Sequence, residues 1–216
     1  MKCPLCDCYP TIFLLKADLR EYWSCPKCGL VFIPPQFFIS KKAEVKRYLE
    51  HDNNLDNEKY VSMFQEKINT IKKVCPKINI VLDYGCGYEP VLKTLLEREG
   101  YQAHGYDLNF FPNEETQMKY DLVISTETFE HIKKPREELA RLIPKISNKG
   151  YLAVMTRFYP AKNHALCLES FSKWYYKRDP THVAFYGQKT FSWMANEFEM
   201  KICHNNEFDF IVFQRK

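Results

Sequence analysis

Four cysteines near the start of the sequence have a spacing that suits metal binding. Cys3 and Cys6 form one Cys-x-x-Cys pair, and eighteen residues separate it from a second pair, Cys25 and Cys28. Each pair places two thiolates on one side of a tight turn, and two such turns complete a tetrahedron of sulfurs about 2.3 Å from a zinc ion. Because cysteine fills all four positions, no coordination site is left for a substrate. We therefore expect the zinc to be structural.

A second group of residues could hold a nucleotide. The run Val-Leu-Asp-Tyr-Gly-Cys-Gly at 81–87 places Gly85 and Gly87 between a predicted buried strand and a predicted helix. Glycine suits this turn because a Cβ would keep the backbone away from a bound nucleotide. Asp107 follows Gly87 by twenty residues, at the end of the next predicted strand. A carboxylate there can accept both ribose hydroxyls of an adenosine, so the two signals converge on one crevice.

Alternating strands and helices are predicted from residue 78 onward, and they would position this crevice. The predicted strands are Ile78–Leu82, Gln102–Tyr106, Tyr120–Ser125 and Tyr151–Met155, and the predicted helices are Pro90–Glu99, Pro135–Ile143 and Gln188–Phe198. Such alternation implies a parallel sheet with right-handed crossovers. Two further strands, Met200–Cys203 and Phe208–Phe213, should close the sheet as an antiparallel hairpin. The expected fold class is thus α/β, with a Rossmann-like, mostly parallel sheet.

Two smaller units are predicted before this domain, which should span residues 78–216. Residues 1–35 form the zinc ribbon, with short strands at Thr11–Leu15 and Glu21–Trp23. Residues 36–77 form a helical cap, with helices at 41–51 and 57–74 whose apolar positions recur at helical spacing. The tyrosines of the cap and His51 either face the active site or have only a packing role.

Composition sets broad limits on the function. The chain has 216 residues, 45% of them hydrophobic, and a net charge of +4, which is too mild and diffuse to argue for nucleic acid by itself. No export signal or stretch of about 18 apolar residues is present, so no membrane association is expected. Nine cysteines, an odd number without an export signal, fit a reducing compartment and favour metal ligation over disulfides. We expect a cytoplasmic protein.

The motifs resemble those of class I S-adenosylmethionine-dependent methyltransferases. Residues 81–87 resemble the first motif of that family, 105–108 the second, 120–132 the fourth-strand motif and 148–152 the turn into the fifth strand. The resemblance implies that S-adenosylmethionine is the cofactor. It implies that Asp83, Gly85 and Gly87 hold the methionine part and that Asp107 holds the ribose. The neighbouring residues implied to bind the cofactor are Cys86, Leu108, Thr126 and Glu127.

Two departures from the family pattern are visible. Glu89 replaces the usual third glycine, so the packing of helix against strand must differ there. Only the eleven residues 109–119 join the second predicted strand to the next, so we predict that the outer third strand is missing or vestigial.

Three residues are candidates for catalysis. His131 follows the fourth-strand motif and either acts as a base or holds a loop. Asp179 and His182 belong to an Asp-Pro-x-His-Val run that precedes a predicted helix, and they either orient each other or form an Asx-type turn. Zinc binding by His182 is not expected without partner ligands.

Two acceptor classes remain possible. The ribbon and the segment after it resemble, more loosely, nucleotide-sugar C-methyltransferases, which favours a small-molecule acceptor. The alternative is an RNA base methyltransferase that binds nucleic acid through the ribbon. Residues 1–33 carry four basic and three acidic side chains, and a zinc with four thiolates adds a charge of about −2. A near-neutral ribbon binds phosphates poorly, which disfavours RNA. The oligomeric state is left open.

Overall fold

The computed structural model describes residues 1–50, 52–113 and 118–216. Its central sheet has six strands in the order β11, β12, β7, β6, β4, β5. These strands are β4 (Ile80–Tyr84), β5 (Gln102–Tyr106), β6 (Tyr120–Thr126), β7 (Ile146–Met155), β11 (Met200–Asn205) and β12 (Phe210–Arg215). β4 pairs in parallel with β5 and β6, and β6 with β7. β12 and β11 close the sheet as an antiparallel hairpin.

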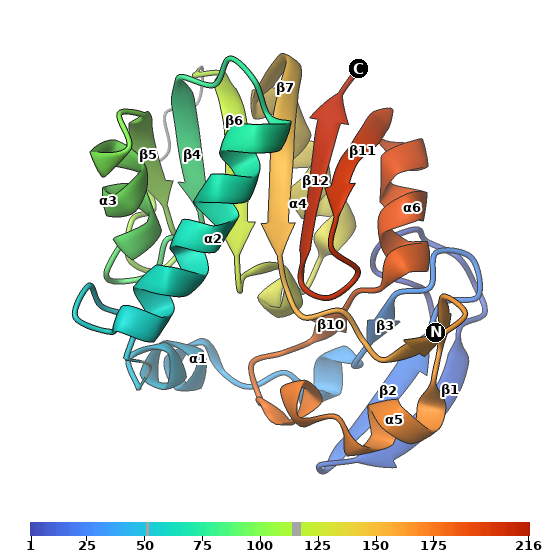
Figure 1. The fold of residues 1–216 in the computed structure, drawn as a ribbon. Coiled ribbons are helices and arrows are strands. Elements are labelled where there is room, and N and C mark those ends of the chain that lie inside the picture. Colours follow the sequence, from blue (N-terminus) through green and yellow to red (C-terminus); the bar gives the residue numbers. More distant parts are fainter. Residues whose placement is uncertain (51, 114–117) are drawn as a thin grey trace.

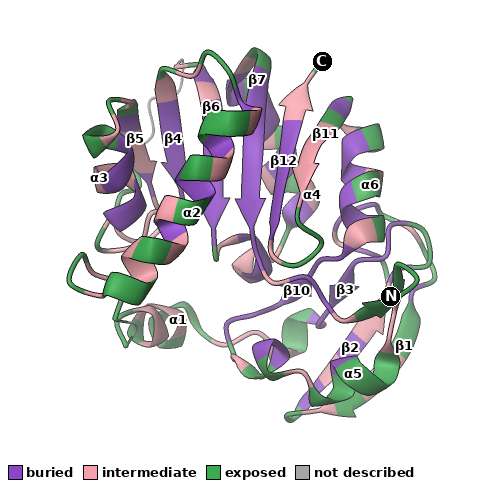
Figure 2. Cartoon of the chain, viewed as in Figure 1, coloured by how far each residue is buried: buried purple, intermediate pink, exposed green. Residues whose placement is uncertain are grey.

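Helices cover both faces of this sheet (Figure 1). α2 (Glu58–Val74) and α3 (Val91–Arg98) pack on one face, and α4 (Pro135–Leu142) and α6 (Gln188–Glu197) pack on the other. In α2, Phe64, Ile68 and Ile71 recur at helical spacing and are fully or almost fully buried. The central strands are buried on both sides, as Figure 2 shows for β4, β6 and β7. Near-continuous burial of this kind is typical of parallel sheets covered by helices.

The N-terminal strands form a second, smaller sheet with a segment from the far end of the chain. Its order is β1 (Ile12–Ala17), β2 (Arg20–Ser24), β3 (Val31–Phe32) and β10 (Ala184–Phe185). The Arg20 guanidinium is buried and donates hydrogen bonds to the carbonyls of Lys177 and, at 3.0 Å, His182. The ribbon strands are therefore anchored to the segment 177–185.

The remaining elements lie mostly at the carboxyl ends of the parallel strands. α1 (Lys41–Tyr48) begins at Ser40, whose side chain accepts from the Ala43 amide, and lies across this edge (Figure 1). α5 (Leu168–Lys173) follows the short hairpin β8 (Ala161–Lys162) and β9 (Ala165–Leu166). The 3₁₀ turns are Pro35–Phe37, Phe129–His131, Ile143–Lys145 and Tyr175–Arg178. No helix in the described part of the chain is long and apolar enough to cross a membrane.

The expected α/β class and closing hairpin are confirmed. β5 is the edge strand of the sheet. The described residues between β5 and β6 form no further strand, which agrees with the prediction that the outer third strand is missing or vestigial. Residues 114–117 lie outside the described residues. His51 also lies outside them. β7 begins at Ile146 rather than at Tyr151, because Ile146 already pairs with Tyr120 across an irregularity in the ladder.

Candidate active site

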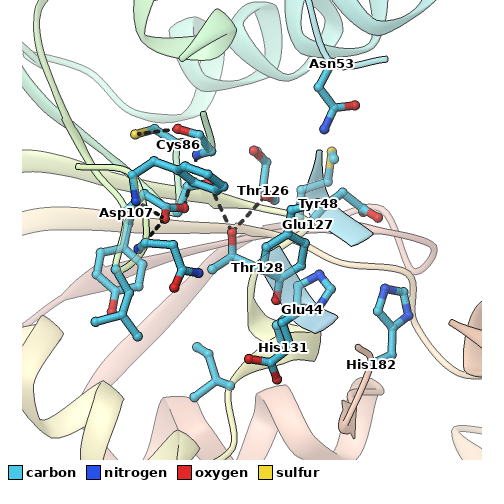
Figure 3. A pocket seen from close by; sticks show the side chains of 18 of the residues that line it. Glu44, Tyr48, Asn53, Cys86, Asp107, Thr126, Glu127, Thr128, His131 and His182 are labelled. Carbon is cyan, nitrogen blue, oxygen red and sulfur yellow. Dashed lines mark hydrogen bonds between the residues drawn. The ribbon is translucent and has the colours of Figure 1, made fainter. Parts of the chain in front are cut away.

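One cavity of about 1130 Å³ opens at the carboxyl ends of β4, β5 and β6. α1, α2 and the residues of 175–182 form its other walls. It brings together all the predicted cofactor and catalytic residues, which are Asp83, Gly85, Cys86, Gly87, Asp107, Leu108, Thr126, Glu127, His131, Asp179 and His182. Figure 3 shows Asp107 and Cys86 at one end, and His131 and His182 at the other.

The loop after β4 is bound directly to the end of β5. The Gly85 and Cys86 amides donate to the Tyr106 carbonyl at 2.7 and 3.1 Å. The Gly87 amide donates to Asp107 Oδ2 at 3.2 Å, while Asp107 Oδ1 accepts from the Asn109 amide at 2.8 Å. The crevice expected between the two strands is therefore present, and backbone amides fix its carboxylate.

The two glycines of this loop serve different purposes. Both have left-handed backbones, with φ of +82° at Gly85 and +71° at Gly87. A Cβ on Gly85 would lie 2.2 Å from Thr128 Oγ1, so this glycine permits close packing. A Cβ on Gly87 would meet no described atom within 4 Å, so the space beside it can admit part of a bound molecule.

Asp83 places a buried carboxyl group at the base of the same loop. Its Oδ2 accepts from the Lys93 amide at 3.1 Å, whereas Oδ1 has no hydrogen-bond partner among the described residues. Burial, with a smaller contribution from the charge of Asp107, raises the pKa of Asp83 to about 7. A cationic ligand near this unpaired oxygen would be stabilised, which fits the ammonium and sulfonium of S-adenosylmethionine.

Two further carboxyl groups lie near the other end of the cavity. The Tyr176 hydroxyl lies 2.6 Å from Glu130 Oε1 and 3.1 Å from Glu127 Oε2. Burial raises the pKa of Glu127 to about 8 and that of Glu130 to about 7. Glu127 also has a left-handed φ of 48°, a strained conformation for a residue with a side chain. Sequence reasoning assigned no role to Glu130, although this residue directly precedes His131.

The two histidines face each other across this end of the cavity. Their ring centroids are 4.8 Å apart. His131 Nδ1 contacts the Thr181 carbonyl at 3.2 Å, and His182 Nδ1 contacts the Tyr176 carbonyl at 2.8 Å. Burial lowers the pKa of His131, and it lowers that of His182 to about 3. Both imidazoles are therefore neutral near pH 7.

Asp179 does not bind the His182 ring. Its Oδ1 accepts from the amide and hydroxyl of Thr181, at 2.9 and 2.5 Å, which is an Asx turn. Its Oδ2 accepts from Arg47 Nη2 at 2.9 Å. Burial raises the pKa of Asp179, but these Thr181 bonds and Arg47 together hold it well below its usual range.

α1 closes the cavity through contacts that sequence reasoning missed. Besides Arg47, Glu44 pairs with Lys133 at 2.6 Å, and the Tyr48 ring packs edge-on against His131 with centroids 5.2 Å apart. The cap tyrosines Tyr48 and Tyr60 both line the cavity. No local pattern marks these pairs, because their partners lie far along the chain.

The four ribbon cysteines also lie together. All are buried, and their sulfurs lie within 4.8 Å of one another. Cys3 Sγ is 3.6 Å from Cys28 Sγ, and Cys6 Sγ is 3.3 Å from Cys25 Sγ. A tetrahedral zinc thiolate site has sulfurs about 3.8 Å apart, so the four side chains fit such an ion.

Comparison with known proteins identifies the family. Residues 53–205 match the family described as a methyltransferase domain, which is well over half of the chain. The chain belongs to this methyltransferase family. The resemblance to class I S-adenosylmethionine-dependent methyltransferases is thereby confirmed. The matched span leaves out the ribbon. No curated protein matches the sequence.

Solved structures share the fold at low identity. A SAM-dependent methyltransferase from Archaeoglobus fulgidus has a TM-score of 0.53 at 16% identity, over 72% of this chain and 94% of that one. An O-methyltransferase family protein from Burkholderia thailandensis has a TM-score of 0.52 at 12% identity, over 79% of this chain and 62% of that one. The plantazolicin methyltransferase BpumL was solved with S-adenosylhomocysteine and a pentazolic desmethylPZN analog. It has a TM-score of 0.51 at 12% identity, over 82% of this chain and 91% of that one.

The first prediction concerns Asp107. Asp107→Ala should weaken binding of S-adenosylhomocysteine by about 100-fold or more, since two hydrogen bonds to a charged group are worth about 3 kcal/mol. Isothermal titration calorimetry measures this change. Asp121→Ala is the control, because Asp121 lies at the amino end of β6, away from the cavity. There it accepts hydrogen bonds from the amides of Asn79 and Ile80. Equal affinity of the Asp107 variant and the wild type would contradict the ribose assignment.

The second prediction concerns pH. The native pKa of Asp83, about 7, lies above its unfolded value near 4, so the native state binds the extra proton between these values. The stability contributed by protonated Asp83 is complete below about pH 4 and is lost as the pH rises through about 7. Urea unfolding should therefore show that the free energy of unfolding of the wild type declines between pH 5 and pH 8. The decline should exceed that of Asp83→Asn by an amount of the order of 2–4 kcal/mol.

Glu127 and Glu130 titrate in both proteins, so the difference between the two profiles isolates Asp83. Parallel profiles of the free energy of unfolding against pH would mean that Asp83 is already ionised in the native protein at pH 5.

Proposed function

We propose that this methyltransferase transfers the methyl group of S-adenosylmethionine to a small-molecule acceptor. The observation that supports this most is the single cavity with two chemically different ends. One end offers glycine backbone and the Asp83 and Asp107 carboxylates, and the other offers Glu127 and two neutral histidines. The buried Glu130 carboxyl lies 3.9 Å from one of these, His131. A cofactor and an acceptor can therefore meet inside one cavity.

The residues expected from the resemblance suit the parts of the cofactor. Asp107 would accept the ribose hydroxyls, the space beside Gly87 would admit the methionine part, and Asp83 would face its ammonium group. Cys86, Leu108 and Thr126 would complete this end, and Glu127, which the resemblance also assigns to the cofactor, would lie between the two ends. When bound, S-adenosylmethionine supplies an electrophilic methyl group on a sulfonium.

The chain itself would supply positioning and a proton acceptor. Methyl transfer is an in-line displacement, so alignment of the acceptor lowers the barrier most. A base acts best when its pKa lies near the working pH, and the raised pKa values of Glu127 and Glu130 meet that condition. His131, which also holds the Thr181 carbonyl, and His182 would orient the acceptor. Asp179 would position the loop through its Asx turn rather than act on the acceptor.

The acceptor end is more suited to a metabolite than to a folded nucleic acid. α1 and the residues of 175–182 cover it, and Arg47 and Asp179 join these two segments. The likeness to BpumL, whose structure contains a pentazolic analog, agrees with a small acceptor.

The ribbon offers few charges to RNA. Of its four basic side chains, Arg20 is buried on backbone carbonyls and Lys2 pairs with Asp7 at 3.0 Å. Only Lys16 and Lys27 remain for phosphates, which is too few for a nucleic-acid clamp.

We also propose that Cys3, Cys6, Cys25 and Cys28 hold one structural zinc ion. The ion would fix the two knuckles that begin and end the β1–β2 hairpin. The boundaries of the ribbon at residue 35 and of the cap at residue 77 stay predictions.

A third prediction tests the acceptor class. When the protein is incubated with methyl-labelled S-adenosylmethionine and a cell extract, the label should enter the small-molecule fraction and not RNA. Asp107→Ala should abolish this labelling, whereas His164→Gln, an exposed change outside the cavity, should leave it unchanged. Label recovered only in RNA would contradict a small acceptor.

A fourth prediction tests the zinc. The purified chain should contain one zinc ion, measured by inductively coupled plasma mass spectrometry, and Cys6→Ser should lose it. Cys203→Ser, on β11, should retain it. Because the ribbon sheet includes β10, losing zinc should also lower the free energy of unfolding of the whole chain. Equal zinc contents in the two variants would disprove the site.

A further inference from the structure

Three side chains near the acceptor end have the arrangement of a metal site, and two of them, His131 and His182, line the cavity. A carboxylate oxygen of Glu130 and one ring nitrogen each of His131 and His182 lie within 4.8 Å of one another. Glu130 and His131 come from the turn after β6, whereas His182 comes from the segment before β10. His182 thus has partner ligands that its sequence neighbourhood did not offer.

Hydrogen bonds orient both histidines toward the space between them. Each Nδ1 contacts a backbone carbonyl, which only accepts, so each Nδ1 carries the proton. The Nε2 atoms are then unprotonated and present lone pairs. A backbone carbonyl that fixes the tautomer of a histidine in this way is the usual outer-shell partner of a metal-ligating histidine.

Glu130 has few donors for a buried carboxylate: the Tyr176 and Thr156 hydroxyls and its own backbone amide lower its pKa by hydrogen bonding. Its side chain is completely buried, and Oε2 has no hydrogen-bond partner among the described residues. Tyr176 has one hydroxyl proton, and both Glu127 and Glu130 lie within hydrogen-bond distance of it. Arg157 offsets part of the charge of Glu127, whereas the largest influences on the pKa of Glu130 include no lysine or arginine. A carboxylate buried in this way is costly unless a cation binds it.

We propose that Glu130, His131 and His182 bind a divalent transition-metal cation at the acceptor end of the cavity. Mixed nitrogen and oxygen ligands suit manganese, iron, cobalt or zinc better than calcium or magnesium. Three protein ligands leave coordination positions open, as in catalytic rather than structural sites. These positions would face the cavity.

The role of this cation rests on the proposed function. A cation at this place would bind and orient a hydroxyl oxygen of the acceptor and lower the pKa of that hydroxyl. The acceptor would then be an alcohol or phenol. The proton leaves its oxygen for Glu127 or solvent, an oxygen–carbon bond to the methyl group forms, and the sulfur–methyl bond breaks. The products are a methyl ether and S-adenosylhomocysteine.

Mn²⁺ is the probe that tests the site, because thiolates of the ribbon bind it weakly. Electron paramagnetic resonance of the full chain, purified with its zinc, should show one saturable Mn²⁺ per chain without cofactor. His182→Gln and Glu130→Gln should weaken Mn²⁺ binding at least about tenfold. His131→Gln should do so with the least effect on folding, because that side chain is 19% exposed. His164→Gln, in the exposed β8–β9 turn, is the matched control and should bind Mn²⁺ like the wild type.

Two results would overturn the proposal. One is the absence of saturable Mn²⁺ binding to the wild type, and the other is unchanged binding in a His131→Gln protein whose circular dichroism is native. Calorimetry with S-adenosylhomocysteine on the same samples separates the two proposals. Cofactor binding without Mn²⁺ binding overturns the metal site alone, whereas Mn²⁺ binding without cofactor binding supports the site and contradicts the proposed function.

Discussion

The contact between the β4 loop and the end of β5 governs the geometry of the site. Three consecutive amides, those of Gly85, Cys86 and Gly87, donate to the Tyr106 carbonyl and the Asp107 carboxylate. Both strands are parallel neighbours, so their carboxyl ends must meet at one edge of the sheet. This contact fixes the loop around the cofactor end of the cavity, and Gly85 lets Thr128 pack closely behind it.

The acceptor end depends on a second set of contacts, which join the turn after β6 to the segment 176–186. The Val183 amide donates to the Glu130 carbonyl at 2.7 Å, and the Tyr186 hydroxyl donates to the Phe129 carbonyl at 3.2 Å. The same segment carries β10, which adds to the ribbon sheet. The ribbon sheet therefore supports the segment that presents His182.

Sequence predicted the sheet and the meeting of the Gly85–Gly87 loop with Asp107, because both depend on local patterns. The strand-helix alternation, the Gly85–Gly87 loop and the four cysteines are each readable from a short stretch. The acceptor end was only partly predictable. His131 and His182 were candidates, but their approach to within 4.8 Å depends on how the chain returns fifty residues later. Arg47 and Asp179 pair across an even longer separation, and β3 and β10 have two residues each, too few for a periodic signal.

A crystal structure of the chain with S-adenosylhomocysteine is the most direct test of the account. The ribose should hydrogen-bond Asp107, and the sulfur should point along the cavity toward Glu130, His131 and His182. An adenosyl group bound beside Asp107 with its sulfur directed away from those three side chains, or bound outside the cavity, would contradict the account.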